Sequence, residues 1–426
     1  MKLRHVVAAS AAIALTATAC GSSTGGGDLA APDADTEGTL KVWLMEGSQP
    51  DTVVEAVNAQ FNEAYPNVDV QVELQQWGGI QDKLTTSLNT DATPCVAEIG
   101  NSLTAKFADA GLLADLTDVA GDLGEENWLP GLAPSGELDG ERYGIPYYGG
   151  VRIVMYNKEH FAEAGVEIPT TLDELESVAA ALSETKGTVE DGYSAFYFPG
   201  KYWYGALPFV WTTGGDIAGQ DGDEWVGEID SAESQEGLGI LKNLVDSYST
   251  APKDGDETKN WEVFMEGNTG MVIDSWWAPG AVVATDPDFT DKTGVFPLPG
   301  VTADETAPVF FGGSDLGVSQ NCAEQGLAVE WVKIITGEEI QTQLAAEGGV
   351  IPNNEAAFVG HEGNDFLLAA DEAAKVSRFT PVSPNWGNVE AEAVLPDMLV
   401  KIFTEQATIE EATAEASASI ADLLNG

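Results

Sequence analysis

The chain has few of the residue types on which most catalytic centres depend. Its 426 residues include only three histidines, His5, His160 and His361, and only three cysteines. Ser-His-Asp or Cys-His catalysis and histidine-rich metal sites therefore have almost nothing to draw on. We accordingly expect neither a metal ion nor a cofactor.

Positive charge is also scarce. The chain carries 18 Lys and Arg against 70 Asp and Glu, which gives a formal net charge of −52. So acidic a surface repels phosphate backbones, which excludes nucleic acid as a partner. The acids are spread along the whole sequence, a pattern typical of a solvated surface. Since 43% of the residues are hydrophobic and 11 are tryptophan, we expect a folded body of two or three domains.

No apolar run is long enough to span a bilayer, which takes roughly 20 residues. The N-terminus instead has Lys2 and Arg4, a short apolar stretch over residues 6–14 and then small residues, a pattern that predicts an export signal over residues 1–19. Cys20 and the Gly/Ser-rich stretch behind it resemble a bacterial lipoprotein start. The resemblance implies a lipid anchor at Cys20, a tether over residues 20–38 and a place on the extracellular face of the cell membrane; plain secretion is the alternative.

Strand and helix patterns alternate after the tether. Residues 39–44 predict a buried strand, 51–65 an amphipathic helix and 68–74 a second strand with period-2 alternation. This alternation predicts an α/β fold on mostly parallel sheets. Further helices are predicted at 80–89, 103–110, 172–182, 231–248, 261–265, 324–335, 389–403 and 409–424, and further strands at 96–99, 152–156, 270–274, 294–298 and 310–319.

Aromatic residues gather in glycine-rich stretches rather than inside periodic segments. Trp77 precedes two glycines, as do Tyr147 and Tyr148, while Trp276 and Trp277 come directly after a predicted strand. Loop aromatics near strand ends favour a ligand site over a core. Flat rings beside hydrogen-bonding side chains suit sugars, which have apolar C–H faces and hydroxyl edges.

Several segments, in order, carry a family resemblance. They are residues 96–101 with 110–117, 143–158, 264–271 and 311–316. In sequence and spacing these resemble the extracellular solute-binding proteins of carbohydrate ABC transporters, the maltose-binding-protein-like group. The resemblance implies a two-lobed, type II periplasmic-binding-protein-like α/β fold. It also implies a monomer that captures a di- or oligosaccharide between its lobes and delivers it to membrane permease subunits.

The same resemblance divides the chain into lobes. It implies a first lobe of residues 39–147 plus 294–335 and a second of 150–292 plus 336–426. Spacing alone leaves Cys95 and Cys322 either as a disulfide or as two separate buried thiols. Because both would fall in the first lobe, the resemblance favours the disulfide.

Ligand positions follow motif by motif. The resemblance implies contacts from Asn101, Ser102, Tyr148, Gly149, Trp203, Tyr204, Trp276, Trp277, Gly312, Gly313, Asp315 and Trp386, to which the aromatic pattern adds Trp77 and the segment after the first strand adds Glu46. Residues 45–48 lack the charged pair of maltose binders, and Gly150 stands where those proteins have an acid. Both departures point away from maltose and towards another di- or oligosaccharide.

Two competing interpretations rest on acidic residues. A secreted glycoside hydrolase needs two facing carboxylates, for which Glu46, Asp274 and Asp315 are the candidates. With so many acids in the chain, chance alone places three near aromatics, so we expect a binding protein and not an enzyme. Residues 221–224 faintly resemble a calcium loop, but the residues that follow favour a β-hairpin.

Overall fold

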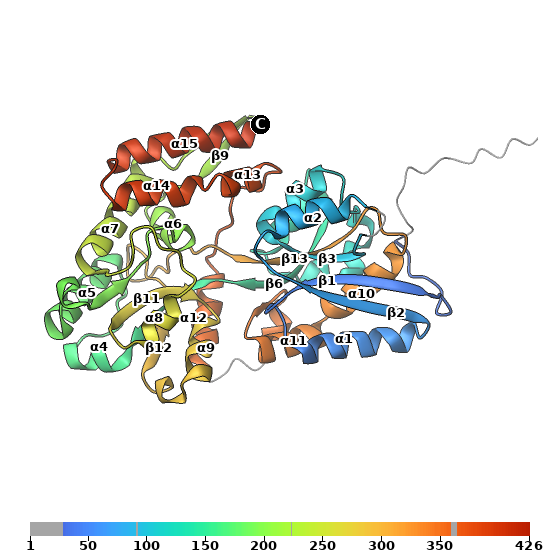
Figure 1. Ribbon diagram of the computed structural model, residues 1–426, viewed down its shortest axis with the longest axis horizontal. Helices are drawn as coiled ribbons and strands as arrows, with labels where there is room; N and C mark the ends of the chain where they lie inside the picture. The colour runs from blue at the N-terminus through green and yellow to red at the C-terminus, as the bar shows by residue number, and fades with distance from the viewer. Residues whose placement is uncertain (1–28, 91–92, 223, 359–363) are drawn as a thin grey trace, which may run out of the picture.

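The computed structural model describes residues 29–90, 93–222, 224–358 and 364–426. The chain folds into two α/β lobes that lie side by side, with strand β6 at the junction between them (Figure 1). The N-terminal export signal and Cys20 lie outside the described residues. No helix within the described ranges is long and apolar enough to cross a membrane.

The first lobe is built on a six-stranded sheet with the order β14-β6-β13-β3-β1-β2. Its strands are β1 (Gly38–Met45), β2 (Val68–Gln75), β3 (Val96–Gly100), β6 (Gly144–Gly150), β13 (Gly312–Val318) and β14 (Ile351–Pro352). β1 pairs in parallel with β2 and β3, as the alternating pattern predicts, whereas β13 runs antiparallel to β3 and β6. Leu40, Val42 and Leu44 of β1 are fully buried, so this strand lies at the centre of the lobe's core.

Helices cover both faces of this sheet. They are α1 (Asp51–Ala64), α2 (Ile80–Leu88), α3 (Thr104–Asp109), α10 (Gln325–Ile335) and α11 (Glu338–Gly348), with short 3-10 turns over Asn101–Leu103, Thr117–Leu123, Glu125–Asn127, Ala133–Gly136 and Glu355–Phe358 and a small ribbon of β4 (Glu137–Leu138) with β5 (Glu141–Arg142). A disulfide joins Cys95, just before β3, to Cys322, just after β13. Because these strands are neighbours, with Val96 opposite Val318, the disulfide clips two adjacent strand ends together.

The second lobe contains a four-stranded sheet with the order β12-β7-β11-β8. Its strands are β7 (Arg152–Asn157), β8 (Ser194–Tyr197), β11 (Thr269–Ser275) and β12 (Thr293–Phe296), and its helices include α4 (Lys158–Ala164), α5 (Leu172–Lys186), α6 (Trp203–Thr212), α7 (Ala232–Tyr248), α8 (Asn260–Met265), α9 (Ala278–Thr285) and α12 (Asp365–Ala374), with 3-10 turns at Val189–Asp191 and Pro287–Phe289. β9 (Ala218–Asp221) and β10 (Glu224–Gly227) pair antiparallel, which confirms the predicted hairpin.

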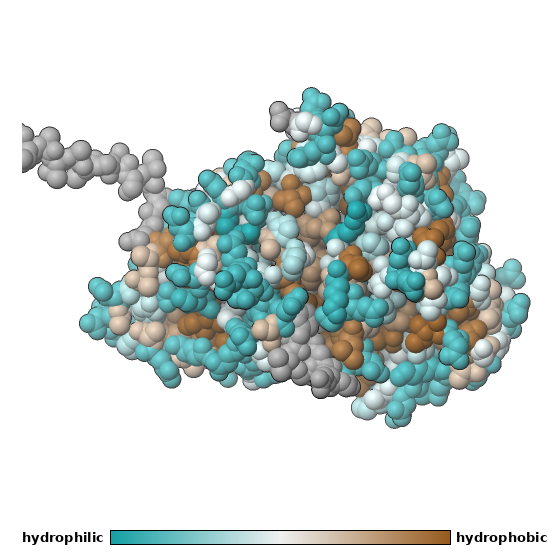
Figure 2. All heavy atoms as spheres, turned by 180° about the vertical axis from the view of Figure 1, so that it is seen from behind, coloured by the Kyte–Doolittle hydropathy of each residue, from teal (hydrophilic) through white to brown (hydrophobic). Residues whose placement is uncertain are grey.

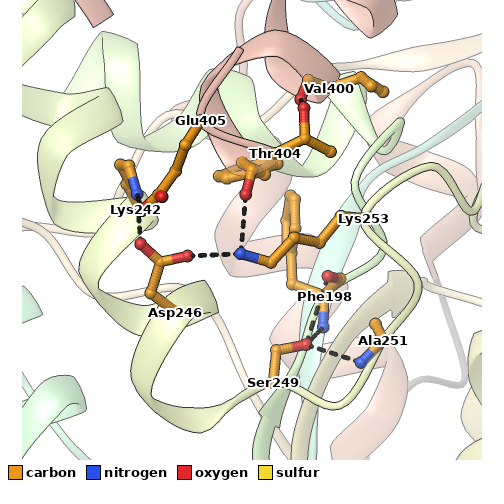
Figure 3. Close-up of polar contacts among 10 residues, drawn as sticks. Phe198, Lys242, Asp246, Ser249, Ala251, Lys253, Val400, Thr404 and Glu405 are labelled. Atoms are coloured by element: carbon orange, nitrogen blue, oxygen red, sulfur yellow. Dashed lines mark hydrogen bonds and ion pairs between the residues drawn. The ribbon is translucent and has the colours of Figure 1, made fainter. Parts of the chain in front are cut away.

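Three C-terminal helices complete the second lobe: α13 (Trp386–Ala391), α14 (Val394–Phe403) and α15 (Ile409–Asn425). A single helix was expected over residues 389–403, but Ala393 has a left-handed backbone (φ 52°) that separates α13 from α14. Lys253 ties this helical layer to α7, because its Nζ donates to Asp246 Oδ1 at 2.9 Å and to the carbonyl of Phe403 at 2.7 Å (Figure 3).

The sheets correct the expected lobe boundaries in two places. β12 was assigned to the first lobe, but it pairs with β7 in the second. The stretch from α11 to β14 was assigned to the second lobe, but α11 packs on α1 and α10 and β14 pairs with β6 in the first. A periodic pattern in the sequence indicates whether a segment is a strand or a helix, but it does not indicate which sheet the segment joins. The sequence therefore could not place β12 or the stretch from α11 to β14 in the correct lobe.

Crossings between the lobes lie where strands pass from one sheet to the other. β6 of the first sheet continues through Val151 directly into β7 of the second, so the first crossing falls after Gly150. The chain returns between β12 and β13. From behind, hydrophilic residues cover most of the visible surface and apolar residues show only in small groups (Figure 2).

Candidate functional site

Two adjoining cavities of about 550 and 390 Å³ lie at the junction of the lobes. They share Trp77, Arg152, Trp276 and Gly313, and so form one continuous cleft. The larger is further lined by Gly79, Ile80, Gln81, Asp82, Gly100, Asn101, Ser102, Leu103, Tyr204, Phe310, Gly312, Glu390 and Ala391, the smaller by Glu46, Gly47, Ser48, Tyr148, Ser275, Trp277, Gly348 and Val350. Sites for small organic ligands have volumes of this order.

Two tryptophans enter this cleft from opposite lobes. Trp77 lies between β2 and α2 of the first lobe, and Trp277 lies between β11 and α9 of the second. Their side chains remain 44% and 43% exposed, although both are large and apolar. Exposed rings on both walls of one cleft provide flat surfaces for a ligand placed between the lobes.

Trp276 lies at the crossing itself. A Cβ atom at Gly150 would lie 1.8 Å from its Cζ3, so the ring packs flush on the backbone at a position where only glycine leaves room. Its buried Nε1 has no hydrogen-bond partner among the described residues. The side chain therefore contributes an apolar face to the cleft wall, while its unpartnered donor is buried.

Polar groups from the first lobe reach the cleft at the end of β3. Asn101 donates from Nδ2 to the carbonyl of Phe311 at 3.2 Å, which fixes its amide while its oxygen stays available. Ser102 lines the same cavity and donates to the Glu390 carboxylate of the second lobe. The two lobes therefore touch through polar groups at the rim of the cleft.

Gly312 and Gly313, both assigned to the ligand from the sequence, line the larger cavity. At Gly313 φ is 142°, and a Cβ there would lie 2.2 Å from the carbonyl oxygen of Tyr148. Only glycine fits such a position, so β13 can approach a ligand closely. Tyr148 lines the smaller cavity, and its hydroxyl is 2.9 Å from Ser48 Oγ.

An aromatic cluster from the second lobe lies behind the opposite wall. Tyr204 lines the cavity and stacks on Phe310 at 4.6 Å between ring centroids. Trp203 packs on the far side of Tyr204 at 3.8 Å and does not line the cavity. Trp203 was expected to contact the ligand, but it opens α6 and packs on Tyr204, so it supports the wall rather than forming it.

Three other predicted positions lie outside the cleft. Trp386 is fully buried in the core of the second lobe, and its Nε1 donates to Glu390 Oε1 at 2.7 Å. Asp315 is buried on the first sheet, where its two carboxylate oxygens accept from Thr104 and Ser135. Gly149 faces the ring of Phe311, which a Cβ would meet at 2.3 Å.

Three charged residues of the cleft, Arg152, Glu390 and Asp82, were missed. The Arg152 guanidinium lies over the ring of Tyr204 at 5.1 Å from its centroid, and its Nε has no partner among the described residues. Burial raises the pKa of Glu390, against the hydrogen bonds from Trp386 and Ser102 that lower it. The only sequence signal for Arg152 was that a cation, rare in this chain, stands at the start of a predicted strand. Glu390 had no such signal, because it is one of 70 acidic residues.

The candidate carboxylates for glycoside hydrolysis do not come together. Glu46 lines the smaller cavity, but Asp274 is buried on β11 and Asp315 on β13, and neither lines the cleft. Burial raises the pKa of Asp274 to about 7 and that of Asp315 to about 6. Burial is the main cause of both shifts; Glu257, which does not line the cleft, adds to the shift of Asp274.

Metal-binding residues do not cluster either. Within the described ranges, no three side chains of histidine, cysteine, aspartate or glutamate lie so that they could hold a metal ion. The cleft is lined by aromatic rings, amides and hydroxyls, by one arginine, Arg152, and by the acids Glu46, Asp82 and Glu390.

Comparisons with known proteins agree with this architecture. The family model for bacterial extracellular solute-binding proteins matches residues 46–342. The diacetylchitobiose-binding protein DasA of Streptomyces coelicolor is 36% identical over 384 residues, which cover 89% of this chain and 88% of that protein. The maltotriose-binding protein of Pyrococcus abyssi is 24% identical over 83% of this chain and 76% of its own length.

Among solved structures, the GacH receptor of Streptomyces glaucescens, described unliganded and in complex with acarbose, superposes with a TM-score of 0.80 at 22% identity, covering 92% of this chain and 99% of that one. The sugar-binding protein MalE from Xanthomonas citri also has a TM-score of 0.80, at 21% identity over 91% of this chain and 97% of its own. These likenesses establish the two-lobed fold. With the family model matching well over half of the sequence, this chain belongs to the bacterial extracellular solute-binding proteins.

Proposed function

We propose that this protein is the extracellular substrate-binding component of a carbohydrate ABC importer, and that it captures a di- or oligosaccharide in the interlobe cleft. One observation carries the proposal: Trp77 and Trp277, on different lobes, expose their rings to the same cleft. A sugar ring held between them buries its apolar C–H faces against both. The amide of Asn101 and the charges of Arg152 and Glu390 then meet its hydroxyl edges.

The relatives narrow the choice of sugar. DasA, at 36% identity, is described as a diacetylchitobiose-binding protein, so an N-acetylated disaccharide is the first ligand to test. Acetamido groups donate through N–H and accept through C=O, and the side-chain amide of Asn101 on the cleft wall carries both a donor and an acceptor. Maltotriose and acarbose, named for more distant relatives, form the comparison set.

Delivery follows from closure of the lobes. A ligand that contacts both walls favours the closed form by its differential affinity for that form, and the closed form is what membrane permease subunits recognise. A lipid on Cys20 and the tether over residues 20–38 would hold the monomer at the membrane beside its transporter. Metabolic labelling with a fatty acid tests the anchor, because Cys20→Ser removes the label if Cys20 is its site.

A sugar panel tests the proposal directly. We expect one or more of diacetylchitobiose, maltotriose and acarbose to raise the melting temperature and to bind one per chain in calorimetry; a ligand at 100 times its dissociation constant stabilises by about 2.7 kcal/mol. Chromatography of the recovered sugar should show no cleavage products. Absence of binding across a broad sugar panel contradicts capture, and turnover that Glu46→Gln abolishes favours the hydrolase.

A further inference from the structure

A buried carboxylate lies beneath the cleft floor. Glu98 of β3 is fully buried, and four donors from three other segments surround it. The Met45 backbone N–H lies 2.7 Å from Oε2, while the hydroxyls of Ser48, Ser314 and Tyr148 lie 2.8, 2.8 and 3.2 Å from Oε1. No ion pair of the described residues involves Glu98.

Two of these hydroxyls belong to the cleft. Ser48 and Tyr148 both line the smaller cavity, together with Trp77 and Trp277. The sequence interpretation assigned Tyr148 to the ligand but gave Glu98 and Ser48 no role. Glu98 therefore contacts the ligand site only through other side chains.

The charge on Glu98 decides which way these hydroxyls point. Each hydroxyl has one proton and can donate it only once. When Glu98 is ionised, Oε1 draws the protons of Ser48 and Ser314, and the Tyr148 proton goes either to Oε1 at 3.2 Å or to Ser48 Oγ at 2.9 Å. All three hydroxyl protons are then used within the network, and the remaining lone pairs of Ser48 and Tyr148 are left for the cleft. When Glu98 is protonated, the proton lies on Oε1, since Oε2 faces the Met45 N–H, and it donates to one hydroxyl whose own proton then turns away.

We propose that Glu98 is a positioning residue that, through Ser48 and Tyr148, makes this part of the cleft an acceptor surface and so selects sugars that present O–H or N–H donors there. The inference rests on the proposed function and specifies, for the part of the cleft beside Ser48 and Tyr148, that the protein accepts hydrogen bonds from the sugar. Neither hydroxyl could supply that polarity alone, because a free hydroxyl turns to suit either a donor or an acceptor.

Charged and titratable groups around the network are few. On β6 Tyr147 neighbours Tyr148, and its hydroxyl lies 3.2 Å from Gln49 Oε1. The exposed Glu46 on the loop after β1 and Arg152 on β7 line the same cavity as Ser48 and Tyr148. On β13 Asp315 follows Ser314 but bonds Thr104 and Ser135. Burial raises the pKa of Glu98, against the lowering by its four donors, so it protonates above the ordinary range of a glutamate.

Glu98→Gln tests the inference because it keeps the shape and reverses the polarity. With its carbonyl facing the Met45 N–H, the new amide donates towards the three hydroxyls and turns their protons outward. Asp315→Asn is the matched control: it neutralises another fully buried carboxylate of the same sheet, also held by two hydroxyls, away from the cleft. The probe is diacetylchitobiose, or the tightest-binding sugar of the panel, titrated by calorimetry from about pH 8 to about pH 4.

We expect Glu98→Gln to weaken binding at neutral pH about tenfold or more, and Asp315→Asn to leave it unchanged. Wild-type and Asp315→Asn affinities should fall as the pH is lowered, because protonation of Glu98 reverses the hydroxyls. The Glu98→Gln affinity should fall less, by only the part that the cleft carboxylate Glu390 contributes through its own raised pKa. A purely structural role lowers stability without removing the pH dependence, and circular dichroism at each pH reports folding.

Two failures are distinguishable. If the wild type binds sugar and Glu98→Gln binds it equally well with the same pH profile, the inference is wrong while the proposed function stands. The same holds if Asp315→Asn is the variant that loses the pH dependence. If the wild type binds no sugar of the panel at any pH, the proposed function fails and the inference fails with it.

Discussion

The substitution Trp386→Ala tests whether Trp386 stabilises the core of the second lobe or binds the ligand, as the family resemblance implied. The side chain is fully buried among the apolar residues of the second lobe, with centroids of Trp386 and Trp203 6.1 Å apart. Replacing a buried aromatic residue with alanine costs about 3 to 5 kcal/mol. Trp386→Ala also removes the Nε1 donor from the buried Glu390 carboxylate, which adds about 1 to 3 kcal/mol for an acceptor left short of a partner.

Urea unfolding followed by circular dichroism measures this loss. We expect Trp386→Ala to lower the free energy of unfolding by at least about 3 kcal/mol. Trp386→Phe keeps most of the ring and loses the donor, so its cost should be smaller. Trp77→Ala is the matched control, because a ring that is 44% exposed contributes little to the core. A loss below about 1 kcal/mol for Trp386→Ala, together with abolished sugar binding, would refute the assignment to the core.

Two further predictions concern the disulfide and the crossing. Replacing both Cys95 and Cys322 by serine opens a loop of 227 residues, for which the chain-entropy model gives a loss of about 5 kcal/mol; a melting temperature unchanged from that of the oxidised wild type would contradict it. Gly150→Ala places a Cβ 1.8 Å from Cζ3 of Trp276, so the indole must move, and sugar affinity should fall while Gly239→Ala, at an unobstructed helix position, leaves it unchanged.

Regular elements were predictable because their patterns are local. β1 is buried on both faces from Val42 to Met45, as expected for a buried strand, and the apolar stripe of α1 at Val53, Val57 and Phe61 follows directly from period 3.6. Trp386 lies just before the predicted helix over residues 389–403 and was assigned to the ligand through the resemblance alone, whereas it opens α13 and packs inward.

Long-range placement was the part that local patterns could not supply. Asp315 lies two residues from Gly313 in the same predicted strand, but the pairing of β13 with β6 shifts register between Ser314 and Asp315. The Asp315 carboxylate accepts from Thr104 and Ser135 and does not reach the cleft. Glu390 joins Ser102 across the lobes although 288 positions of sequence order separate them, a contact that no single segment encodes. Which faces of separate segments meet is decided by tertiary packing.

Calorimetric titration of Trp77→Ala and Trp277→Ala tests the central claim most directly. Diacetylchitobiose, or the tightest-binding sugar of the panel, is titrated into the wild type, both variants and Trp225→Ala, whose ring lies on the β10 hairpin strand away from the cleft. The account predicts one site in the wild type, a loss of about tenfold or more in each cleft variant with unchanged melting temperature, and wild-type affinity in Trp225→Ala. Wild-type affinity in both cleft variants would contradict capture between the two tryptophans.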